Sequence, residues 1–314
     1  MLQRLSGVKM PRLSVIIPHR GDAVQLVGCL TALTMQGVPP DEIIVVGNND
    51  IDDSPAIRAV VHAICGSAIV IHAPQIGAGL ARNAGVAASG GEWLAFVDSD
   101  CRPAPDWIAS GRQALETLSL FGGAIDVVAP PGTRPTPVEA FDIAFGFDAE
   151  RFLRRSGHLL TTNLFCTRAV FDLVGPFRSG VPEDKEWSWR ARAAGLDLAV
   201  RPEVVVEHPA LATWPELAYR WRRMTVEEYA LSRERRFGQL RFWLRSWLVL
   251  ASIVPHSLRS MRVAEIVPAR RVIAVLMRIR SYRFIVAQEL IVSAVSGRVG
   301  KLRPNFGRHP GRDQ

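Results

Sequence analysis

The first third of the chain alternates short apolar runs with segments of helical periodicity. Apolar runs rich in Val and Ile lie at residues 13–18, 42–46 and 68–72, and a fourth run lies at residues 93–97. Apolar positions with helical spacing occur at residues 24–33, and a second helical pattern ends at residues 60–64. A strand, helix, strand order with connections this short predicts right-handed βαβ units with parallel strands.

The run at residues 93–97 ends in an acidic turn, Asp98-Ser99-Asp100, which Pro103 and Pro105 keep from becoming helix. Open α/β sheets bind ligands outside the carboxyl ends of their strands. Two carboxylates two residues apart can share one hard divalent cation and leave positions open for substrate phosphates. The alternative is a solvated turn, because Asp is a common turn residue.

A glycine-containing helical segment at residues 77–85 precedes that strand. It lacks the dinucleotide-binding fingerprint, because Arg82 stands where the third glycine would be. The helix instead presents Arg82 and Asn83 to whatever lies at the sheet edge. The alternative is an ordinary helix of small residues packed tightly on the sheet.

Composition indicates a globular protein whose charge is unevenly distributed. The 314 residues are 48% hydrophobic and 22% charged, which argues against wholesale disorder. Residues 1–200 carry 17 basic and 21 acidic residues, whereas residues 201–314 carry 21 and 9. The second region is therefore where an anionic partner would be met. Nothing beyond charge indicates nucleic-acid binding.

The four cysteines, at positions 29, 65, 101 and 166, have neither zinc-site spacing nor the density of a disulfide framework. They are typical of free thiols in a reducing compartment. Residues 1–12 mix basic side chains with short apolar pieces, so no signal peptide is predicted. We expect the protein to be cytoplasmic, either free or peripheral on the inner face of the cell membrane.

Taken in order, these segments resemble glycosyltransferase family 2. The similarity lies in four stretches: Ser14-Val15-Ile16-Ile17-Pro18, Glu42-Ile43-Ile44-Val45-Val46, Ala81-Arg82-Asn83-x-Gly85 and residues 91–100. It extends over roughly residues 12–210, and the ordered series is more specific than any one piece. The resemblance implies a GT-A fold, in which helices cover both faces of a Rossmann-like, mostly parallel central sheet. It also implies a nucleotide-sugar donor, a diphosphate bridged by a divalent cation (Mn²⁺ or Mg²⁺) and inversion at the anomeric carbon.

The same resemblance implies a donor and metal site. The family's acidic motif falls on Asp98 and Asp100, and its Ala-Arg-Asn segment implies that Arg82 and Asn83 lie on the donor side. The family's second strand is usually followed by an Asp that helps to hold the nucleoside, but Gly47 stands at that place. The identity of the nucleotide therefore stays open. The predicted donor-binding residues are Pro18, Arg20, Asn48, Asn49, Asp50, Arg82, Asn83, Asp98 and Ser99.

The family's catalytic acid pair corresponds to Glu183-Asp184. A carboxylate at hydrogen-bond distance can take the proton that a sugar hydroxyl loses as it attacks the anomeric carbon. By motif position Asp184 is the expected base and Glu183 its neighbour, whereas adjacent carboxylates at a helix start can also be mere caps. Trp187 and Trp189 cannot share a helix face, so one is expected in the core and the other against a sugar ring.

His208 follows two short apolar runs, at residues 198–200 and 204–206, that are expected to be strands. It lies where several GT-A enzymes have a histidine that adds a metal contact, although a lone histidine is more often structural. Arg220-Trp221 resembles part of the Gln-x-x-Arg-Trp motif of processive members, but Leu217 replaces the Gln. Transfer of a single sugar is therefore expected, with a saccharide or lipid-linked saccharide of the cell envelope as acceptor.

After Trp214 the chain turns to long helical patterns rich in Arg. Apolar stretches at residues 242–254 and 272–295 contain Arg245, Arg278, Arg280 and Arg283, which are costly in hydrocarbon. They are expected to be amphipathic helices on an anionic membrane surface, or helices packed on the catalytic domain or a second subunit. The predicted organisation is an N-terminal tail (1–11), a GT-A domain (12–210), a helical region (211–302) and a flexible tail (303–314).

Two other classes of protein remain as alternatives. A nucleotidyltransferase uses a similar sheet and metal carboxylates, but the residues after the first strand, 19–22, make a poor phosphate loop. A catalytically degenerate GT-A binding module is the other alternative, because Gly47 departs from the family pattern.

Overall fold

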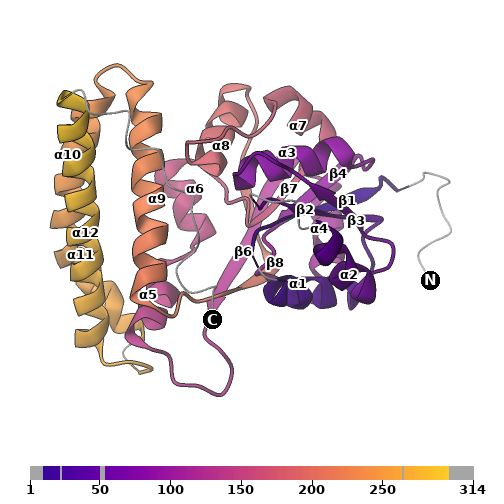
Figure 1. Ribbon diagram of the computed structural model, residues 1–314, viewed down its shortest axis with the longest axis horizontal. Coiled ribbons are helices and arrows are strands. Elements are labelled where there is room, and N and C mark those ends of the chain that lie inside the picture. Colours follow the sequence, from indigo (N-terminus) through magenta and orange to yellow (C-terminus); the bar gives the residue numbers. More distant parts are fainter. Residues whose placement is uncertain (1–9, 22, 50–53, 264, 297–314) are drawn as a thin grey trace.

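The computed structural model describes residues 10–21, 23–49, 54–263 and 265–296. Its centre is an eight-stranded sheet with the order β3-β2-β1-β4-β7-β6-β8-β5. Helices cover both faces of the sheet, and a layer of long helices stands at one end of the molecule (Figure 1). This is the mixed α/β architecture of the predicted GT-A class, with four parallel and three antiparallel strand pairs.

The first four strands are parallel and lie where the apolar runs predict them. The elements of this half are β1 (Leu13–His19), α1 (Val24–Thr34), β2 (Glu42–Gly47), α2 (Ser54–Ile64), β3 (Ile69–His72), α3 (Ala78–Ala88) and β4 (Trp93–Val97). β1 pairs with β2 on one side and with β4 on the other. The carboxyl ends of all four strands therefore meet at one edge of the sheet.

The second half departs more from the prediction. Its elements are β5 (Arg102–Pro103), α4 (Trp107–Leu115), β6 (Leu120–Val128), α5 (Pro137–Phe145), α6 (Ala149–Ser156), β7 (Asn163–Thr167), α7 (Arg168–Val174), α8 (Glu183–Ala193) and β8 (Ala199–Pro209). The two short strands expected at residues 198–200 and 204–206 are one strand, β8, whose register against β6 shifts after Gly123. Helices α5 and α6 were not predicted.

A buried asparagine accommodates that register shift. Asn163 donates from Nδ2 to the carbonyl oxygens of Ala124 (2.8 Å) and Val204 (2.9 Å), and its Oδ1 accepts from the indole N–H of Trp107 (3.0 Å). These bonds satisfy backbone groups that an irregular ladder leaves unpaired. Gly123 leaves room for the amide, because a Cβ there would lie 2.2 Å from Asn163 Nδ2.

Two hydrophobic cores hold the helices to the sheet. One core contains side chains of α1, α2 and α4 against one face of the strands. The other contains α3, α7 and α8, with Trp187 and Phe177 among its largest members. Both faces of the strands are thus buried, which explains why their sequences are continuous apolar runs.

Five helical elements form the C-terminal layer: α9 (Trp214–Arg233), α10 (Gly238–Ala251), α11 (Ile253–Arg259), the 3₁₀ helix η1 (Ser260–Val263) and α12 (Ala269–Val295). A third core joins Leu217 of α9 and residues of α12 to α5, so the helical layer shares buried surface with the sheet region. The domain boundary expected near residue 210 stays a prediction. No helix in the described ranges is both long and apolar enough to cross a membrane.

The Arg-Trp motif after Thr213 packs inside this layer. Leu217 is fully buried, and Arg220 pairs with the buried Asp142 of α5. The guanidinium of Arg283 lies 4.1 Å from the ring centre of Trp221, within the range of a cation–π contact. Arg220 and Trp221 therefore link α9 to α5 and α12.

We predict that Asp142→Ala lowers the free energy of unfolding by about 3 kcal/mol, because removing the buried partner leaves the partly buried Arg220 charge unpaired. Asp142 also accepts the backbone N–H of Leu211 over 3.0 Å. Denaturant unfolding would measure the loss. The control is Asp148→Ala, which removes the partly exposed cap of α6 and an ion pair with Arg259 and should cost about 1 kcal/mol. Equal losses would contradict the prediction.

Candidate active site

The acidic turn lies at the carboxyl edge of the parallel strands. All five side chains of β4 are buried, and the N–H of Cys101 donates to the carbonyl oxygen of Asp98 over 3.0 Å, which closes the turn. Ser99 lies beside the end of β1, with its hydroxyl 3.2 Å from Nδ1 of His19. Asp98 and Asp100 are therefore held where a ligand of the sheet would bind.

Arg82 of α3 joins the two acidic segments of the chain. Its guanidinium donates to Asp98 Oδ1 over 2.6 Å and to Glu183 Oε1 over 2.9 Å, and its side chain is buried. Gly79 allows α3 to approach α8, because a Cβ there would lie 3.3 Å from the Cβ of Glu183. One guanidinium thus spans the distance from the end of β4 to the start of α8.

Asp98 uses both carboxylate oxygens within the protein, because Oδ2 accepts from the hydroxyl of Thr162 over 2.9 Å. Burial opposes its ionisation, but Arg82 and the Thr162 hydrogen bond hold the pKa of Asp98 below its usual value. To bind a cation, Asp98 would have to share an oxygen with one of these partners. Its expected metal role stays a prediction.

Asp100 and His208 form a donor set that fits a divalent cation. Nε2 of His208 lies 3.7 Å from Asp100 Oδ2. Nδ1 of His208 is 2.7 Å from the carbonyl oxygen of Pro209, and because a carbonyl only accepts, the proton of the neutral ring lies on Nδ1. Nε2 is then free of a proton, and an imidazole nitrogen beside a carboxylate suits Mn²⁺. No group of three or more His, Cys, Asp or Glu gathers for a metal within the described residues, so further ligand atoms would come from the donor.

Glu183 and Asp184 begin α8, where the N-terminal end of the helix favours negative charge. Asp184 Oδ1 accepts the backbone N–H of Lys185 over 2.7 Å. Burial, together with the neighbouring carboxylate of Glu183, raises the pKa of Asp184 to about 7. A carboxyl group with a pKa near neutral pH is suited to general-base catalysis.

Helix α9 adds two charged residues that were not predicted for the site. Arg223 lies 3.6 Å from Glu227, and both interact electrostatically with Glu183 and Asp184. Burial raises the pKa of Glu227 to about 8; the acid pair adds to this effect and Arg223 opposes it. The sequence shows an i, i+4 Arg–Glu pair, but nothing in it indicates that this pair faces α8.

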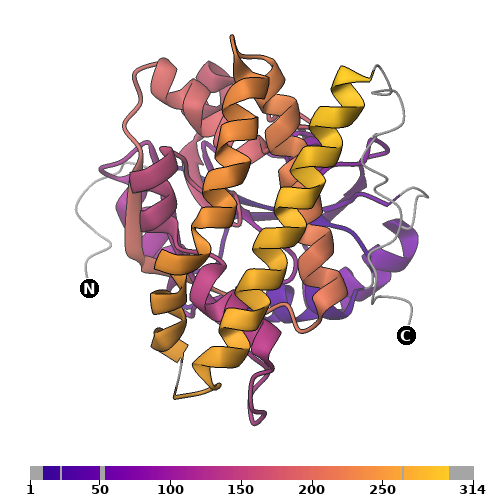
Figure 2. The same cartoon turned by 90° about the vertical axis from the view of Figure 1, so that its left-hand side faces the viewer.

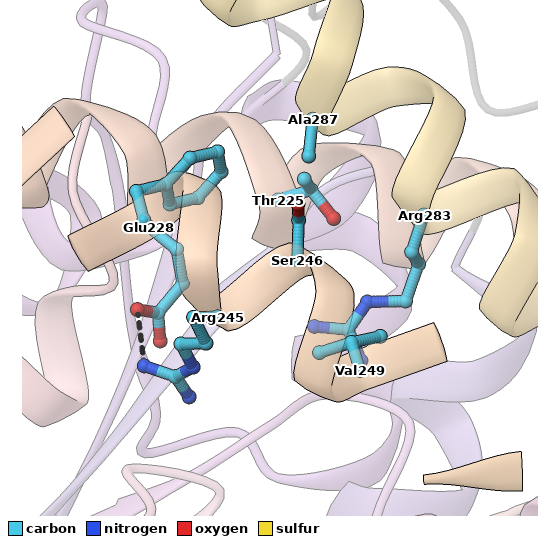
Figure 3. A pocket seen from close by; sticks show the side chains of 8 residues that line it. Thr225, Glu228, Arg245, Ser246, Val249, Arg283 and Ala287 are labelled. Carbon is cyan, nitrogen blue, oxygen red and sulfur yellow. Dashed lines mark hydrogen bonds and ion pairs between the residues drawn. The ribbon is translucent and has the colours of Figure 1, made fainter. Parts of the chain in front are cut away.

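Ion pairs hold α8 against α9. Lys185 Nζ lies 2.6 Å from Glu228 Oε1, and Arg178, on the segment before α8, pairs with Glu234 at 2.6 Å. The other oxygen of Glu228 lies 3.5 Å from Arg245 of α10. Figure 3 shows this pair at the edge of a cavity of about 30 Å³ that Arg283 of α12 also lines. Glu228 therefore links the helix of the acid pair to the C-terminal layer.

Trp187 lies in the core as expected, but Trp189 is not open to a sugar ring. The indole N–H of Trp189 donates to the carbonyl oxygen of Ser156 over 2.9 Å. The guanidinium of Arg235 lies 4.1 Å from its ring centre, and Lys185 Nζ lies at 4.8 Å. The expectation that Trp189 stacks on a sugar ring is corrected, because the side chains of Arg235 and Lys185 already lie against the Trp189 ring.

Among the predicted donor-binding residues, Asn48 and Asn83 bond to the chain itself. Asn48 donates to the carbonyl oxygens of Ala73 and Gln75 and accepts from the N–H of Gly77, which has the positive φ of +143° that favours glycine. Asn83 donates to the carbonyl oxygen of Phe177 and accepts from its N–H, both over 2.8 Å. Both side chains thus shape loops at the sheet edge.

Three other predicted donor residues, Pro18, Arg20 and Asn49, lie around the end of β1. Pro18 is buried and opposite Val46, and Arg20 follows the strand, partly buried. Asn49 accepts the backbone N–H of Gly21 over 3.1 Å. Asp50 lies outside the described residues. Their contacts with a donor stay predictions.

Comparison with known proteins identifies the family. The model of the family described as Glycosyl transferase family 2 matches residues 14–172, slightly more than half of the chain. The chain belongs to glycosyltransferase family 2. It is a glycosyltransferase, and membership argues against the nucleotidyltransferase alternative.

The relatives of this family 2 chain agree with that assignment. The chain is 33% identical over 208 residues to "Glycosyltransferase AglE" of Haloferax volcanii, a match covering 64% of this chain and 68% of that protein. It is 31% identical over 120 residues to "Succinoglycan biosynthesis protein ExoO" of Rhizobium meliloti, covering 38% of this chain and 33% of that one. A solved mannosyltransferase, PcManGT from Pyrobaculum calidifontis, has a similar fold, with a TM-score of 0.58 and 17% identity. The match covers 90% of this chain and 88% of that one.

We predict that Glu227→Gln makes the protein more stable than the wild type at alkaline pH. The pKa of Glu227 in the fold, about 8, exceeds its usual value of 4.5, so this group's contribution to stability is complete below about pH 4.5 and is lost as pH rises through about 8. Gln has no proton to lose. Thermal unfolding of both proteins between about pH 5 and about pH 9 would measure a growing difference. Exposed Glu203→Gln is the control, and parallel curves for Glu227→Gln and the wild type would contradict the prediction.

Proposed function

We propose that this glycosyltransferase is inverting and metal-dependent and moves one sugar from a nucleotide-diphosphate donor to a hydroxyl acceptor. The observation that carries the proposal is the Arg82 bridge, which brings the acidic turn and the acid pair to one site. A donor diphosphate at Asp100 would then have its anomeric carbon near Asp184. The predicted roles of Asp98, Ser99 and the loop residues belong to the same proposal.

Asp184 is the general base of this proposal. A sugar hydroxyl attacks the anomeric carbon on the face opposite the leaving diphosphate, which inverts the configuration, and Asp184 accepts the hydroxyl proton. Arg82 holds Glu183 beside Asp184, and the carboxylate of Glu183 raises the proton affinity of the base. Arg82 forms an ion pair with Asp98 but not with Asp184. It therefore lowers the pKa of Asp184 less than it lowers that of Asp98.

Asp100 and His208 are the proposed metal ligands. A divalent cation held there would neutralise the charge that develops on the diphosphate oxygens of the leaving group. The proposal is supported by the tautomer of His208, which leaves Nε2 unprotonated beside Asp100. The similar fold of PcManGT, whose structure is described as a complex with GDP-Man and Mn²⁺, supports a divalent cation and a nucleotide sugar.

A saccharide, free or lipid-linked, is the proposed acceptor. The names of the relatives support this class, because one of them is a succinoglycan biosynthesis protein. Transfer of a single sugar is favoured because Leu217, which replaces the Gln of the processive motif, lies in the core. An acceptor on a membrane lipid would also explain why the enzyme has a basic helical layer.

We predict that Asp184→Asn lowers kcat by at least about 100-fold without weakening donor binding, because it removes the proton acceptor. In the wild type, kcat/KM should fall as pH drops below about 7, where protonated Asp184 can no longer accept a proton. Steady-state kinetics over pH and calorimetric donor titration would measure both effects.

Glu186→Gln is the matched control for Asp184→Asn, because it makes the same change of charge in the same turn of α8. Glu186 pairs with Arg190 and Arg178, so its loss should affect stability more than turnover. Retained turnover in Asp184→Asn would remove Asp184 from the base role.

We predict that Asp100→Ala weakens Mn²⁺-dependent donor binding by more than about tenfold, because it removes a metal ligand. Calorimetric titration of a panel of nucleotide diphosphate sugars, with and without Mn²⁺, would measure this and identify the donor. Asp106→Ala, an exposed aspartate a few residues later in the chain, is the control and should bind normally. Unchanged donor affinity in Asp100→Ala would count against the metal site.

A further inference from the structure

The outer surface of the C-terminal layer is unusually apolar. Of the 22 large apolar side chains that are exposed in the described part of the chain, 14 lie between Phe237 and Val295. On α10 they recur at helical spacing, which makes one continuous face. Its members are Leu240, Trp243, Leu244, Trp247 and Leu248.

Helix α12 extends this face. The ring of Phe284 lies 4.6 Å from that of Trp247, and Ile285 and Val292 are 53% and 64% exposed beside it. A shallow groove of about 410 Å³ runs along α12 from Phe284 to Ser293. Figure 2 shows α10 and α12 side by side in front of the rest of the molecule, on the side away from the sheet. We call the apolar residues of this surface the outer face: Leu240, Trp243, Leu244, Trp247, Leu248, Phe284, Ile285 and Val292.

Helix α12 has apolar side chains on both its buried and its exposed side: Val272, Leu276 and Ile279 are buried, while Ile285 and Val292 are exposed. Arg280 and Arg283 turn inward, towards the ring of Trp221, while Ile285 and Val292 point outward. Burial lowers the pKa of Arg283 to about 9 and that of Arg280 to about 10. The exposed side of a surface helix that faces water is normally polar, so the exposed apolar residues of the outer face indicate an apolar neighbour.

Charge distinguishes the possible neighbours. Residues 233–296 contain twelve Arg and three Glu, and exposed arginines at 241, 270 and 271 belong to the two helices of the outer face. A second copy docked through the same face would bring two such basic surfaces together. Residues 297–314 are also basic and contain only three large apolar side chains, Val299, Leu302 and Phe306, too few to cover the face.

We propose that the outer face of α10 and α12 docks on an anionic lipid bilayer. Its Leu, Ile and Trp side chains enter the boundary between head groups and acyl chains, and the arginines around them contact anionic head groups. The enzyme then lies on the membrane with α9 between the lipid and the acid pair. Because α8 is tied through Glu228 to Arg245 of α10, the docked layer is joined directly to the helix of the base.

The test is co-sedimentation of the full chain with phosphatidylcholine vesicles, with and without phosphatidylglycerol, in the absence of any sugar. Leu244→Glu with Leu248→Glu on α10 should weaken binding to the anionic vesicles at least tenfold. The control, Leu173→Glu with Met35→Glu, makes the same change of charge at similarly exposed sites of α7 and of the end of α1, and it should bind like the wild type. Thermal unfolding midpoints confirm that each variant folds.

A second arm separates charge from burial. Arg241→Gln, Arg270→Gln and Arg271→Gln together should reduce binding to anionic vesicles and remove its sensitivity to salt. Analytical ultracentrifugation tests the other occupant: a dimer that the α10 changes dissociate, together with no binding to vesicles, would overturn the proposal. The proposal would also be overturned if the wild-type protein did not bind anionic vesicles, or if the α10 variants bound them as well as the control does. No outcome depends on the proposed reaction, because neither donor nor acceptor is present.

Discussion

The active site depends on the ion pairs of one buried arginine. Arg82 lies between Asp98 and Glu183, 2.6 and 2.9 Å from their oxygens. A buried guanidinium is stable only when its charge is compensated, so the end of β4 and the start of α8 must both stay close to α3. The same interaction leaves Asp184 without the direct cation partner that Asp98 has. Two aspartates of one site therefore differ in proton affinity, with Asp98 held ionised and Asp184 shifted to about 7.

The C-terminal layer completes this site. Glu227 and Arg223 of α9 face the acid pair, and the Lys185–Glu228 pair ties α8 to the same helix. Three acidic side chains of the site, with fewer cations beside them, share a partly buried space, which explains why burial and mutual repulsion raise two of their pKa values. A change in the position of α9 would alter the environment of the base.

The layer also shows a division of roles between its two sides. Its inner side holds Arg280 and Arg283 against the ring of Trp221, and such pairs are favourable when they are partly desolvated. Its outer side carries aliphatic and indole groups. Two of the arginines that interrupt the apolar stretch at residues 272–295, Arg280 and Arg283, thus contact an aromatic ring inside the layer, while Arg278 stays exposed.

The sequence by itself determined the parallel half of the sheet and the order of the candidate motifs, because continuous apolar runs and proline or glycine stops are local signals. It also identified Asp98, Arg82 and Asp184 as a series along the chain. Only the tertiary structure decided that Arg82 bridges two of the segments, that Asn48 bonds to its own loops and that Glu227 faces the acid pair. These facts depend on contacts between residues that are far apart in sequence; Arg82 and Glu183, for example, are separated by 101 positions. Periodicity reports which positions share a side of a helix, but the packing of the whole chain decides what each side meets. In α12 that packing buries Val272 and Leu276, turns Arg283 towards Trp221 and leaves Ile285 and Val292 exposed.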